Sequence, residues 1–314
     1  MKLLSRFSLS DAGILGINAR NLEYLFPKNP RHLYKLADDK IRTKAIAQEL
    51  AVNVPETYGI IRFQNEVKQF ADLVQDHDAF VLKPAGGSGG DGIQVITGKS
   101  EKGYRKSSGN VMSESDIKYH LHNVLSGMFS LSGSSDAVII EYAVQFDPVF
   151  NDISYQGVPD VRVIVYHGVP VMAMLRLPTR RSDGKANLHR GGVGVGVDIA
   201  TGQTTVGIQN NQYLERHPET DHPLRGIAIP HWQEILTMSA RLGDRTEFGY
   251  LGVDFVLDQQ LGPLLLEINA RPGLSIQIAN QEGLIPRLEA VDAVRSKLAD
   301  LGEKVDFAQR NFAA

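Results

Sequence analysis

The chain has 314 residues, of which 42% are hydrophobic and 22% are charged. This length is enough for a large core divided between two subdomains, and the composition excludes wholesale disorder. A formal net charge of −3 gives no reason to expect nucleic acid as a partner. The absence of cysteine excludes disulfides and thiolate metal sites. With no evident secretory signal and no apolar run near the roughly 18 residues of a membrane span, we expect a cytoplasmic protein without membrane insertion.

Strand and helix signals alternate along the chain. Apolar periodicity and flanking turn residues predict helices at residues 41–50, 65–74, 116–129, 231–242 and 286–298. Short apolar runs bounded by turn residues predict strands at residues 79–82, 93–96, 137–142, 161–167, 169–175, 193–199, 250–257 and 263–269. Two polar stretches, 98–116 and 179–192, are interpreted as mobile surface segments, and the sequence leaves open whether they close as lids.

The stretch from residue 248 to residue 274 predicts a β-hairpin that holds a metal ion. Asp254 and Glu267 lie symmetrically about a polar turn, so a symmetric register places their Cβ atoms about 4.5–5.5 Å apart. Asn269 lies two residues beyond Glu267 and therefore on the same face of the strand. Two carboxylates and one amide suit a hard cation such as Mg²⁺, with Mn²⁺ as an alternative. The competing interpretation is an exposed hairpin with polar residues on its wet face.

A glycine-dense loop separates the predicted strands at residues 79–82 and 93–96. Its glycines let backbone N–H groups approach an anion closely, and Lys83, at the end of the preceding strand, can reach a phosphate held there. The loop differs from a Rossmann fingerprint because a strand follows it. A flexible glycine-rich hairpin without a ligand is the alternative. The candidate nucleotide-binding positions in the loop are Gly86, Gly87, Ser88, Gly89 and Gly90.

These motifs occur in an order that resembles the ATP-grasp superfamily. The ordered set is Lys40, Lys83 with its glycine loop, Glu141, Asp254, Glu267 and Asn269. Within the superfamily the chain is most similar to the RimK-type α-L-glutamate ligase-like proteins, from Asp39-Lys40-Ile41-Arg42 to about residue 290. The resemblance implies an α+β ATP-grasp fold, in which two α+β subdomains grip ATP between them.

The resemblance also implies roles for individual residues. Lys40 and Lys83 would contact the phosphates of ATP, and Glu141 with Tyr142 would lie at the hinge that holds adenine. His189 belongs to a run that relatives use around the phosphates and the substrate, and we interpret it as a positioning hydrogen-bonding residue more than as a general base. The alternatives are a surface lysine at position 40 and a strand-end surface charge at position 141.

Four arginines are candidates for catalysis. Guanidinium groups fit carboxylate and phosphate oxygens, so they could orient an acid and stabilise a tetrahedral oxyanion. For each of them a solvated surface position or a structural ion pair is the alternative. Arg271 departs from the RimK-type pattern Asn-Ala-Ser-Pro-Gly, which has serine at this point. The four candidates are Arg162, Arg176, Arg190 and Arg271.

The same resemblance suggests a division of the chain into four segments. We expect a truncated N-terminal segment at 1–39, a first ATP-grasp subdomain at 40–142, a second at 143–291 and a C-terminal helix or tail at 292–314. Relatives usually carry a complete α/β domain before the first lysine. We therefore expect the acceptor site to be built differently, with a partner protein or a homo-oligomer as one way to complete it.

Three functions follow from these expectations. The favoured one is an ATP-dependent carboxylate–amine ligase that forms an amide or peptide bond through an acyl phosphate, adding glutamate or another amino acid to a small molecule or peptide. The alternative is an ATP-grasp phosphotransferase acting on a hydroxyl or sugar-like acceptor. A nucleotide-binding regulatory subunit is the third. The sequence does not identify the acid or the amine.

Overall fold

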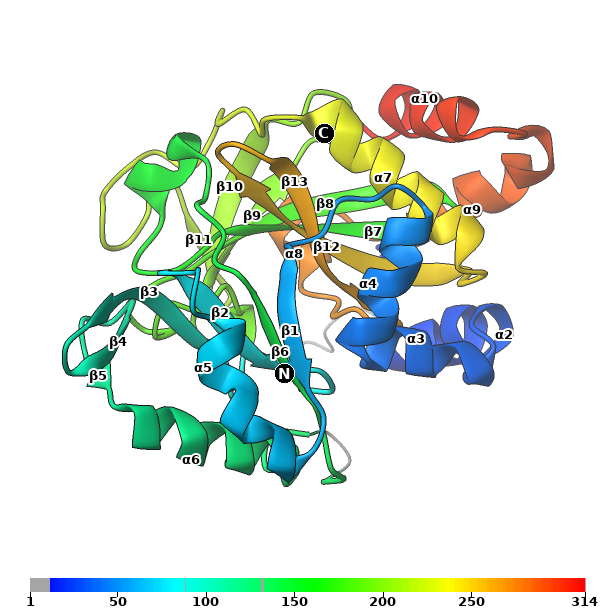
Figure 1. Ribbon diagram of the computed structural model, residues 1–314. Helices are drawn as coiled ribbons and strands as arrows, with labels where there is room; N and C mark the ends of the chain where they lie inside the picture. Colours follow the sequence, from blue (N-terminus) through cyan, green and yellow to red (C-terminus); the bar gives the residue numbers. More distant parts are fainter. Residues whose placement is uncertain (1–11, 88, 131–132, 314) are drawn as a thin grey trace, which may run out of the picture.

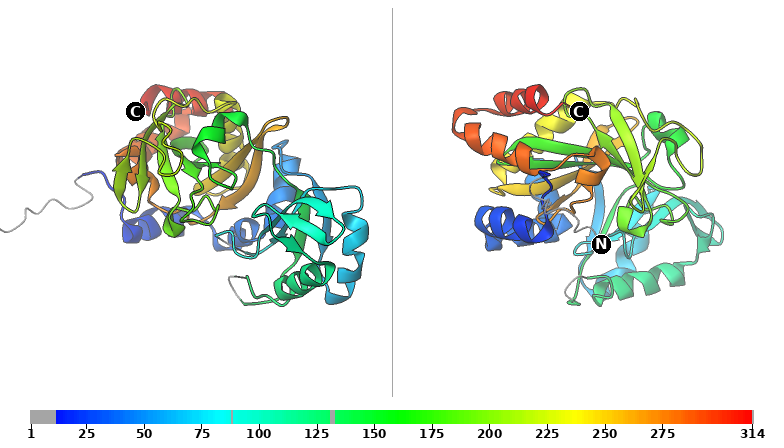
Figure 2. Two further views of the ribbon diagram at one scale, coloured as in Figure 1. Left: turned by 90° about the vertical axis from the view of Figure 1, so that its left-hand side faces the viewer. Right: turned by 180° about the vertical axis from the view of Figure 1, so that it is seen from behind.

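The computed structural model describes residues 12–87, 89–130 and 133–313. Two sheets organise these residues, and each has helices packed against it (Figure 1). Every pairing between their strands is antiparallel. The predicted α+β fold class is therefore confirmed. Figure 2 shows the first sheet and the C-terminal helices at opposite ends of the molecule.

The first sheet has the strand order β1-β6-β2-β3-β4-β5 and a small core of its own. Its strands are β1 (Thr57–Ile61), β2 (Phe80–Pro84), β3 (Gln94–Ser100), β4 (Gly103–Lys106), β5 (Val111–Met112) and β6 (Val138–Tyr142). The helical segments beside it are the 3₁₀ turn η3 (Gln64–Gln69), α5 (Phe70–Leu73) and α6 (Glu114–Leu125). The predicted helix at residues 65–74 is thus a 3₁₀ segment followed by a single α-helical turn.

Strands β4 and β5 correct one expectation from the sequence. Residues 98–116 were predicted to be a mobile surface segment, but they extend the first sheet by two strands and begin α6. Tyr104 explains the difference, because its ring packs edge-on against Phe70 and Phe80 at centroid distances of 5.5 and 5.7 Å. One aromatic side chain thereby ties a polar stretch to the core.

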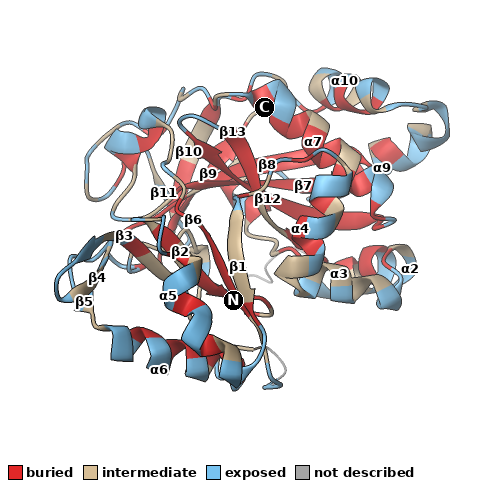
Figure 3. Ribbon diagram, viewed as in Figure 1, coloured by how far each residue is buried: buried red, intermediate tan, exposed pale blue. Residues whose placement is uncertain are grey.

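The second sheet has the strand order β11-β10-β9-β8-β7-β12-β13. Its strands are β7 (Asp160–Tyr166), β8 (Val169–Leu177), β9 (Val193–Val197), β10 (Thr204–Gln209), β11 (Gln212–Leu214), β12 (Tyr250–Asp258) and β13 (Gly262–Asn269). Every residue of β7, β9 and β12 is buried, which explains why these strands read as nearly continuous apolar runs (Figure 3).

Helices pack against the second sheet, and some of them lie between its strands in the sequence. Helices α7 and α10 contact β8, and α8 contacts β8, β9 and β10. The helical segments are η4 (Pro148–Ile153), η5 (Leu188–Arg190), α7 (Trp232–Arg245), α8 (Ile276–Asn280), α9 (Ile285–Val294), η6 (Arg295–Lys297) and α10 (Leu301–Asn311). Within the described residues no helix is both long and apolar enough to cross a membrane.

The β12–β13 hairpin forms as predicted and contains a β-bulge. Asp254 lies opposite Glu267, and Gly252 lies opposite Asn269. Nearer the turn, Phe255 pairs with Leu265, so the register shifts by one residue between Asp254 and Phe255. Without that shift Asp254 would face Leu266, and the Glu267 side chain would point to the other face of the sheet. The bulge therefore brings the two carboxylates together.

The N-terminal helices belong with the second sheet. They are α1 (Ile17–Ala19), the π-helix η1 (Arg20–Leu25), α2 (Phe26–Lys28), η2 (Arg31–Leu33), α3 (Tyr34–Asp38) and α4 (Lys40–Glu49). The Tyr24 ring lies 5.7 Å from Tyr166 and 6.2 Å from Tyr250, and the Asn29 side chain bonds to the backbone of Tyr250. Ala47 of α4 joins the larger core. The proposed four-segment division of the chain stays a prediction, but α4 packs with the second sheet.

Candidate active site

A cavity of about 360 Å³ gathers many of the residues predicted from the sequence. This size falls in the usual range for small-molecule sites. Ala37 and Asp38 of the N-terminal helices form part of its wall, as do Asn187 and Leu188 of the 179–192 segment. The predicted site residues that line the cavity are Lys40, Gly87, Gly89, Arg162, Arg176, His189, Glu267, Asn269 and Arg271.

Asp254 lies beneath this cavity and is held by two arginines. Arg162 donates to its two oxygens at 2.7 and 2.5 Å, and Arg176 donates to Oδ2 at 2.7 Å. The Asp254 side chain is only 1% exposed. Burial alone would raise the pKa of this carboxyl, but the two guanidinium groups outweigh burial and hold the pKa below its usual range. Asp254 is therefore a fully paired carboxylate.

The sheet register explains this charge network. Arg162 on β7 is the cross-strand partner of Asp254 on β12, and Asp160 on β7 is the partner of Arg176 on β8. Arg176 bonds to both Asp160 and Asp254, so it links the two pairs. The result is an alternating row of two carboxylates and two guanidinium groups across three neighbouring strands. Its two arginines line the cavity, and we call this row the floor of the cavity.

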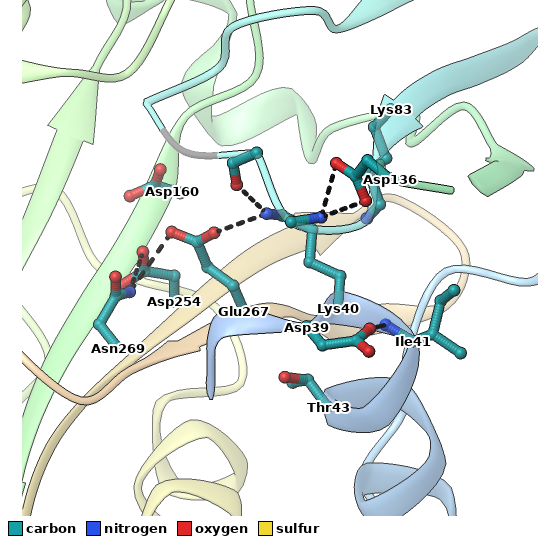
Figure 4. A network of polar contacts seen from close by, with 12 residues as sticks. Asp39, Lys40, Ile41, Thr43, Lys83, Asp136, Asp160, Asp254, Glu267 and Asn269 are labelled. Carbon is teal, nitrogen blue, oxygen red and sulfur yellow. Dashed lines mark hydrogen bonds and ion pairs between the residues drawn. The ribbon is translucent and has the colours of Figure 1, made fainter. Parts of the chain in front are cut away.

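Lys40 faces this floor from the start of α4. Asp39 caps the helix by accepting hydrogen bonds from the backbone of Ile41 and Arg42, which fixes the first turn. The Lys40 ammonium lies 3.6 Å from Glu267 and donates to the carbonyl oxygen of Gly87 (Figure 4). Lys40 thus bridges the glycine loop and the hairpin, and its contact with phosphates stays a prediction.

The oxygen ligands of the hairpin fit a hard cation only in part. Glu267 and Asn269 line the cavity. The side-chain Nδ2 of Asn269 donates hydrogen bonds to Glu267 at 3.3 Å and to Asp254 at 3.1 Å. Among the described residues there is no cluster of three His, Cys, Asp or Glu side chains that could hold a metal. The predicted set has two carboxylates and an amide, and Asp254 could join it only by leaving one of its arginines. Glu267 and Asn269 are accordingly the two candidate metal ligands that face the cavity.

The glycine loop already holds an anion from the protein itself. The Gly86 N–H donates to both carboxylate oxygens of Asp136, at 3.0 and 3.1 Å. Gly89, Gly90 and Gly92 have φ values of +63°, +79° and +74°, which non-glycine residues rarely adopt. Gly86 and Gly90 are not among the lining residues of the cavity. Ser88 lies outside the described residues.

Lys83 and Glu141 form a separate, buried cluster with Lys44. The two lysines contact different oxygens of the Glu141 carboxylate, each at 2.5 Å, and Lys44 also donates to the carbonyl of Pro55. Burial lowers the pKa of the Lys44 ammonium, against the raising effect of Glu141. None of the three lines the cavity. Sequence reasoning missed Lys44, although its position one helical turn after Lys40 was a signal.

Tyr142 also lies away from the cavity lining. Its hydroxyl donates to Asp258 at 3.0 Å, and burial together with Asp258 raises its pKa to about 12. Tyr142 and Asp258 thereby join β6 of the first sheet to β12 of the second. The structure thus brings Lys40 together with the β12–β13 hairpin, but the predicted adenine hinge does not line the same cavity.

Arg271 is held over an aromatic ring of the N-terminal helices. Its guanidinium group lies 4.4 Å from the centre of the Tyr34 ring, a cation–π contact. Arg20, buried at the start of the π-helix η1, donates to the carbonyl of Pro272 at 2.8 Å. The N-terminal helices therefore position the loop that follows the hairpin. Sequence reasoning did not assign Tyr34 or Arg20 to the site, because their proximity depends on tertiary packing.

The 179–192 segment contacts the glycine loop. Arg190 bonds to both oxygens of Asp91 at 2.7 and 2.6 Å, and Lys185 lies 3.8 Å from the same carboxylate. Arg190 is thus exposed and paired outside the cavity, whereas His189 lines it. Whether this segment opens and closes as a lid stays a prediction.

The sequence from residue 19 to residue 293 matches the family model of the sugar-transfer associated ATP-grasp proteins. The chain belongs to this ATP-grasp family. The match confirms the predicted ATP-grasp superfamily and fold, whereas the RimK-type assignment stays a prediction. It also begins within the N-terminal helices, which the resemblance from residue 39 onward left out. No curated protein sequence matches this ATP-grasp chain significantly.

The chain also matches several solved structures, with TM-scores below 0.5 for the three that follow. The ligase PsnB complexed with a minimal precursor is 14% identical, with a TM-score of 0.44 over 85% of this chain and 62% of PsnB. The D-cycloserine synthetase DcsG is 15% identical, with a TM-score of 0.47 over 86% of this chain and 73% of DcsG. For D-alanyl-alanine synthetase A from Vibrio cholerae the values are 14%, 0.43, 89% and 66%. The chain thus spans less than two thirds of PsnB.

Proposed function

We propose that the protein is an ATP-dependent carboxylate–amine ligase. The observation that carries this proposal is Arg271, whose guanidinium group lines the cavity and contacts the Tyr34 ring but no carboxylate among the described residues. Guanidinium groups attract a substrate carboxylate, which attacks as an anion and needs no base. A hydroxyl acceptor would instead have to lose a proton to a base.

The proposed reaction has two steps. An oxygen of the substrate carboxylate attacks the γ-phosphorus of ATP, forming a C–O–P linkage while the bond to ADP breaks. The amine nitrogen then attacks the carbonyl carbon of this acyl phosphate, a C–N bond forms, and inorganic phosphate leaves with the electron pair of the broken C–O bond. The amine proton passes to the departing phosphate or to water. The RimK-type resemblance supports glutamate or another amino acid in a small molecule or peptide product.

The residues of the cavity have distinct proposed tasks. Lys40 would neutralise phosphate charge, and Arg271 would orient the acid and stabilise developing negative charge at the carbonyl oxygen. Arg162 and Arg176 are already paired with Asp254 and Asp160, so we propose that they fix the shape of the floor. Mg²⁺ held by Glu267 and Asn269 would supply charge neutralisation of the phosphates. Lys83 could reach a phosphate only if it leaves Glu141.

A second candidate is a phosphotransferase acting on a hydroxyl or sugar-like acceptor. The family description, sugar-transfer associated, favours it. His189 lines the cavity and would be the candidate base. This reaction would give a stable phosphorylated product, visible by ³¹P NMR, and no free phosphate.

Hydroxylamine offers a direct test of the ligase. With ATP, Mg²⁺ and a panel of amino acids and dipeptides as acids, we expect the wild-type protein to form a hydroxamate, because hydroxylamine traps an acyl phosphate. Glu267→Gln should reduce the rate by about 10²- to 10³-fold, the usual loss for a group that stabilises transition-state charge. Glu289→Gln is the matched control, since Glu289 is exposed and does not line the cavity.

The outcomes separate the candidates. No hydroxamate from the wild type with any acid of the panel, together with a phosphorylated hydroxyl compound, would replace the ligase by the phosphotransferase. Nucleotide binding without turnover of any kind would favour a regulatory subunit.

A further inference from the structure

A second cavity of about 80 Å³ adjoins the main one. Leu188, His189 and Ser275 line both cavities, so the two share a wall. The His189 Nε2 atom also approaches Gly273 of the main cavity, 3.9 Å from where a Cβ atom would lie. A substrate bound in the smaller cavity would therefore lie next to the cavity in which the acid is activated.

The lining of this smaller cavity differs in charge from that of the main one. Its polar side chains are the amides of Asn210 and Asn211 and the hydroxyl of Ser275, and its apolar ones include Ile208. Apart from His189 on the shared wall, no titratable side chain belongs to its described lining. The main cavity has Lys40, three arginines and two carboxylates. The lining of the smaller cavity is thus partly polar and partly apolar, and apart from His189 it has no side chain that carries a formal charge.

The two asparagines are fixed by a tight turn. Gln209 of β10 pairs with Gln212 of β11, so Asn210 and Asn211 form a two-residue hairpin loop. Their φ values of +50° and +63° are those of a type I′ turn, in which asparagine is favoured. The Gln209 side chain donates to the carbonyl of Gly191 at 2.8 Å and ties the hairpin to the 179–192 segment. The turn therefore presents its two amides in a defined place beside the cavity.

We propose that the smaller cavity binds the body of the amine acceptor and that this body is uncharged and hydroxylated, as in a small amino alcohol. This inference rests on the proposed ligase function. Amide and hydroxyl groups match hydroxyls as donors and acceptors. An acceptor amino acid would have to place its carboxylate against a wall with no lysine or arginine, which leaves the charge unpaired. The acceptor nitrogen would attack the carbonyl carbon of the acyl phosphate from this side, with phosphate as the leaving group.

A matched pair of acceptors tests the charge preference. Serinol and serine have the same size and differ in a hydroxymethyl group against a carboxylate. With the acid found in the hydroxamate screen, we expect amide formation with serinol to have a kcat/KM about tenfold or more above that with serine, corresponding to about 1.4 kcal/mol. An equal or higher kcat/KM for serine would overturn the proposal, as would no amide from serinol while hydroxamate forms.

Two variants test the location of the subsite. Asn210→Gly and Asn211→Gly remove each amide, and glycine adopts the positive φ of the turn without strain. We expect each to raise KM for serinol by about three- to tenfold, the value of one hydrogen bond, with hydroxamate formation unchanged. Gln281→Gly is the control, because Gln281 also has a positive φ of +55° but lies outside both cavities.

The design separates this inference from the proposed function. If the wild type forms no hydroxamate, the ligase itself is contradicted. If it forms hydroxamate normally and both asparagine variants keep the wild-type KM for serinol, the ligase stands and the acceptor subsite is overturned.

Discussion

At the scale of single residues, pairing decides which charges are available for chemistry. Asp254 has both oxygens occupied by Arg162 and Arg176, whereas Glu267 is 30% exposed and has Lys40 3.6 Å away. Two carboxylates that face each other across one hairpin therefore differ in accessibility. Glu267 faces the cavity and is therefore the better candidate for a metal ligand. Asp254 instead holds the two arginines of the floor in place.

Glu141 provides a residue-scale prediction for stability. Its carboxylate is the shared partner of Lys44 and Lys83, and all three side chains are at most 8% exposed. Glu141→Gln leaves two buried ammonium groups without their counter-charge, so we expect the free energy of unfolding in urea to fall by about 3–5 kcal/mol. Glu114→Gln removes an exposed partner of Lys118 and should cost at most about 0.5 kcal/mol. Equal losses for the two variants would contradict the buried cluster.

His167 provides a prediction for the pH dependence of stability. Burial, with Arg295 and Lys28 nearby, lowers its pKa to about 4. In the unfolded chain the pKa is about 6.5, so the unfolded state takes up the proton first as pH falls. The contribution of His167 is complete above pH 6.5 and is lost between about pH 6.5 and 4.

The corresponding variant is His167→Asn, because asparagine tolerates the φ of +48° at this turn. We expect its urea midpoint to decline less between pH 7.5 and pH 5 than that of the wild type. His32→Asn, at an exposed histidine, should keep the wild-type decline. If His167→Asn declines as steeply as the wild type, His167 does not carry this part of the pH dependence.

At the scale of elements, local irregularities bring the site together. The β-bulge in the β12–β13 hairpin places Glu267 opposite Asp254. The N-cap at Asp39 fixes the first turn of α4 and thus Lys40. The glycine loop between β2 and β3 turns through three residues with positive φ and lies against the 179–192 segment. Each of these irregularities orients a side chain or a backbone N–H group that would point in another direction from a regular helix or strand.

Gly92 tests whether the shape of the glycine loop depends on glycine. It has a φ of +74°, and a Cβ atom there would lie 2.6 Å from the Phe129 ring. We expect Gly92→Ala to lower the free energy of unfolding by about 1–3 kcal/mol. Gly98→Ala is the control, since nothing lies within 4 Å of its Cβ position, and it should be neutral or slightly stabilising. Equal stability of the two variants would show that the loop relaxes without cost.

At the scale of the whole molecule, the site depends on contacts between strands that are not neighbours in sequence. The sequence predicted the pairing of Asp254 with Glu267, because both flank one short turn. It could not predict that Arg162 and Arg176 bind Asp254, since this requires β7 to lie beside β12, which is far from it in the sequence. Lys44 was missed for the same reason: its partner Glu141 lies on β6 of the other sheet.

The contacts of the N-terminal helices with the site also could not be predicted from the sequence. The sequence predicts a truncated N-terminal segment at residues 1–39, before the first ATP-grasp subdomain. The family match begins at residue 19, and Tyr34 and Arg20 contact the loop that carries Arg271. Their roles follow from packing against the second sheet, which no local pattern encodes. The order of the motifs along the chain, by contrast, was enough to predict the superfamily.

The central claim is that a substrate carboxylate takes the γ-phosphoryl group of ATP in the cavity between Lys40, Glu267 and Arg271. Transfer of ¹⁸O from an acid to phosphate tests it most directly. The measurement uses acids labelled in the carboxylate, with ATP, Mg²⁺ and hydroxylamine, and follows inorganic phosphate by ³¹P NMR. We predict that each phosphate released carries one ¹⁸O atom from the acid. Unlabelled phosphate, or the γ-phosphoryl group recovered on a hydroxyl, would contradict the claim.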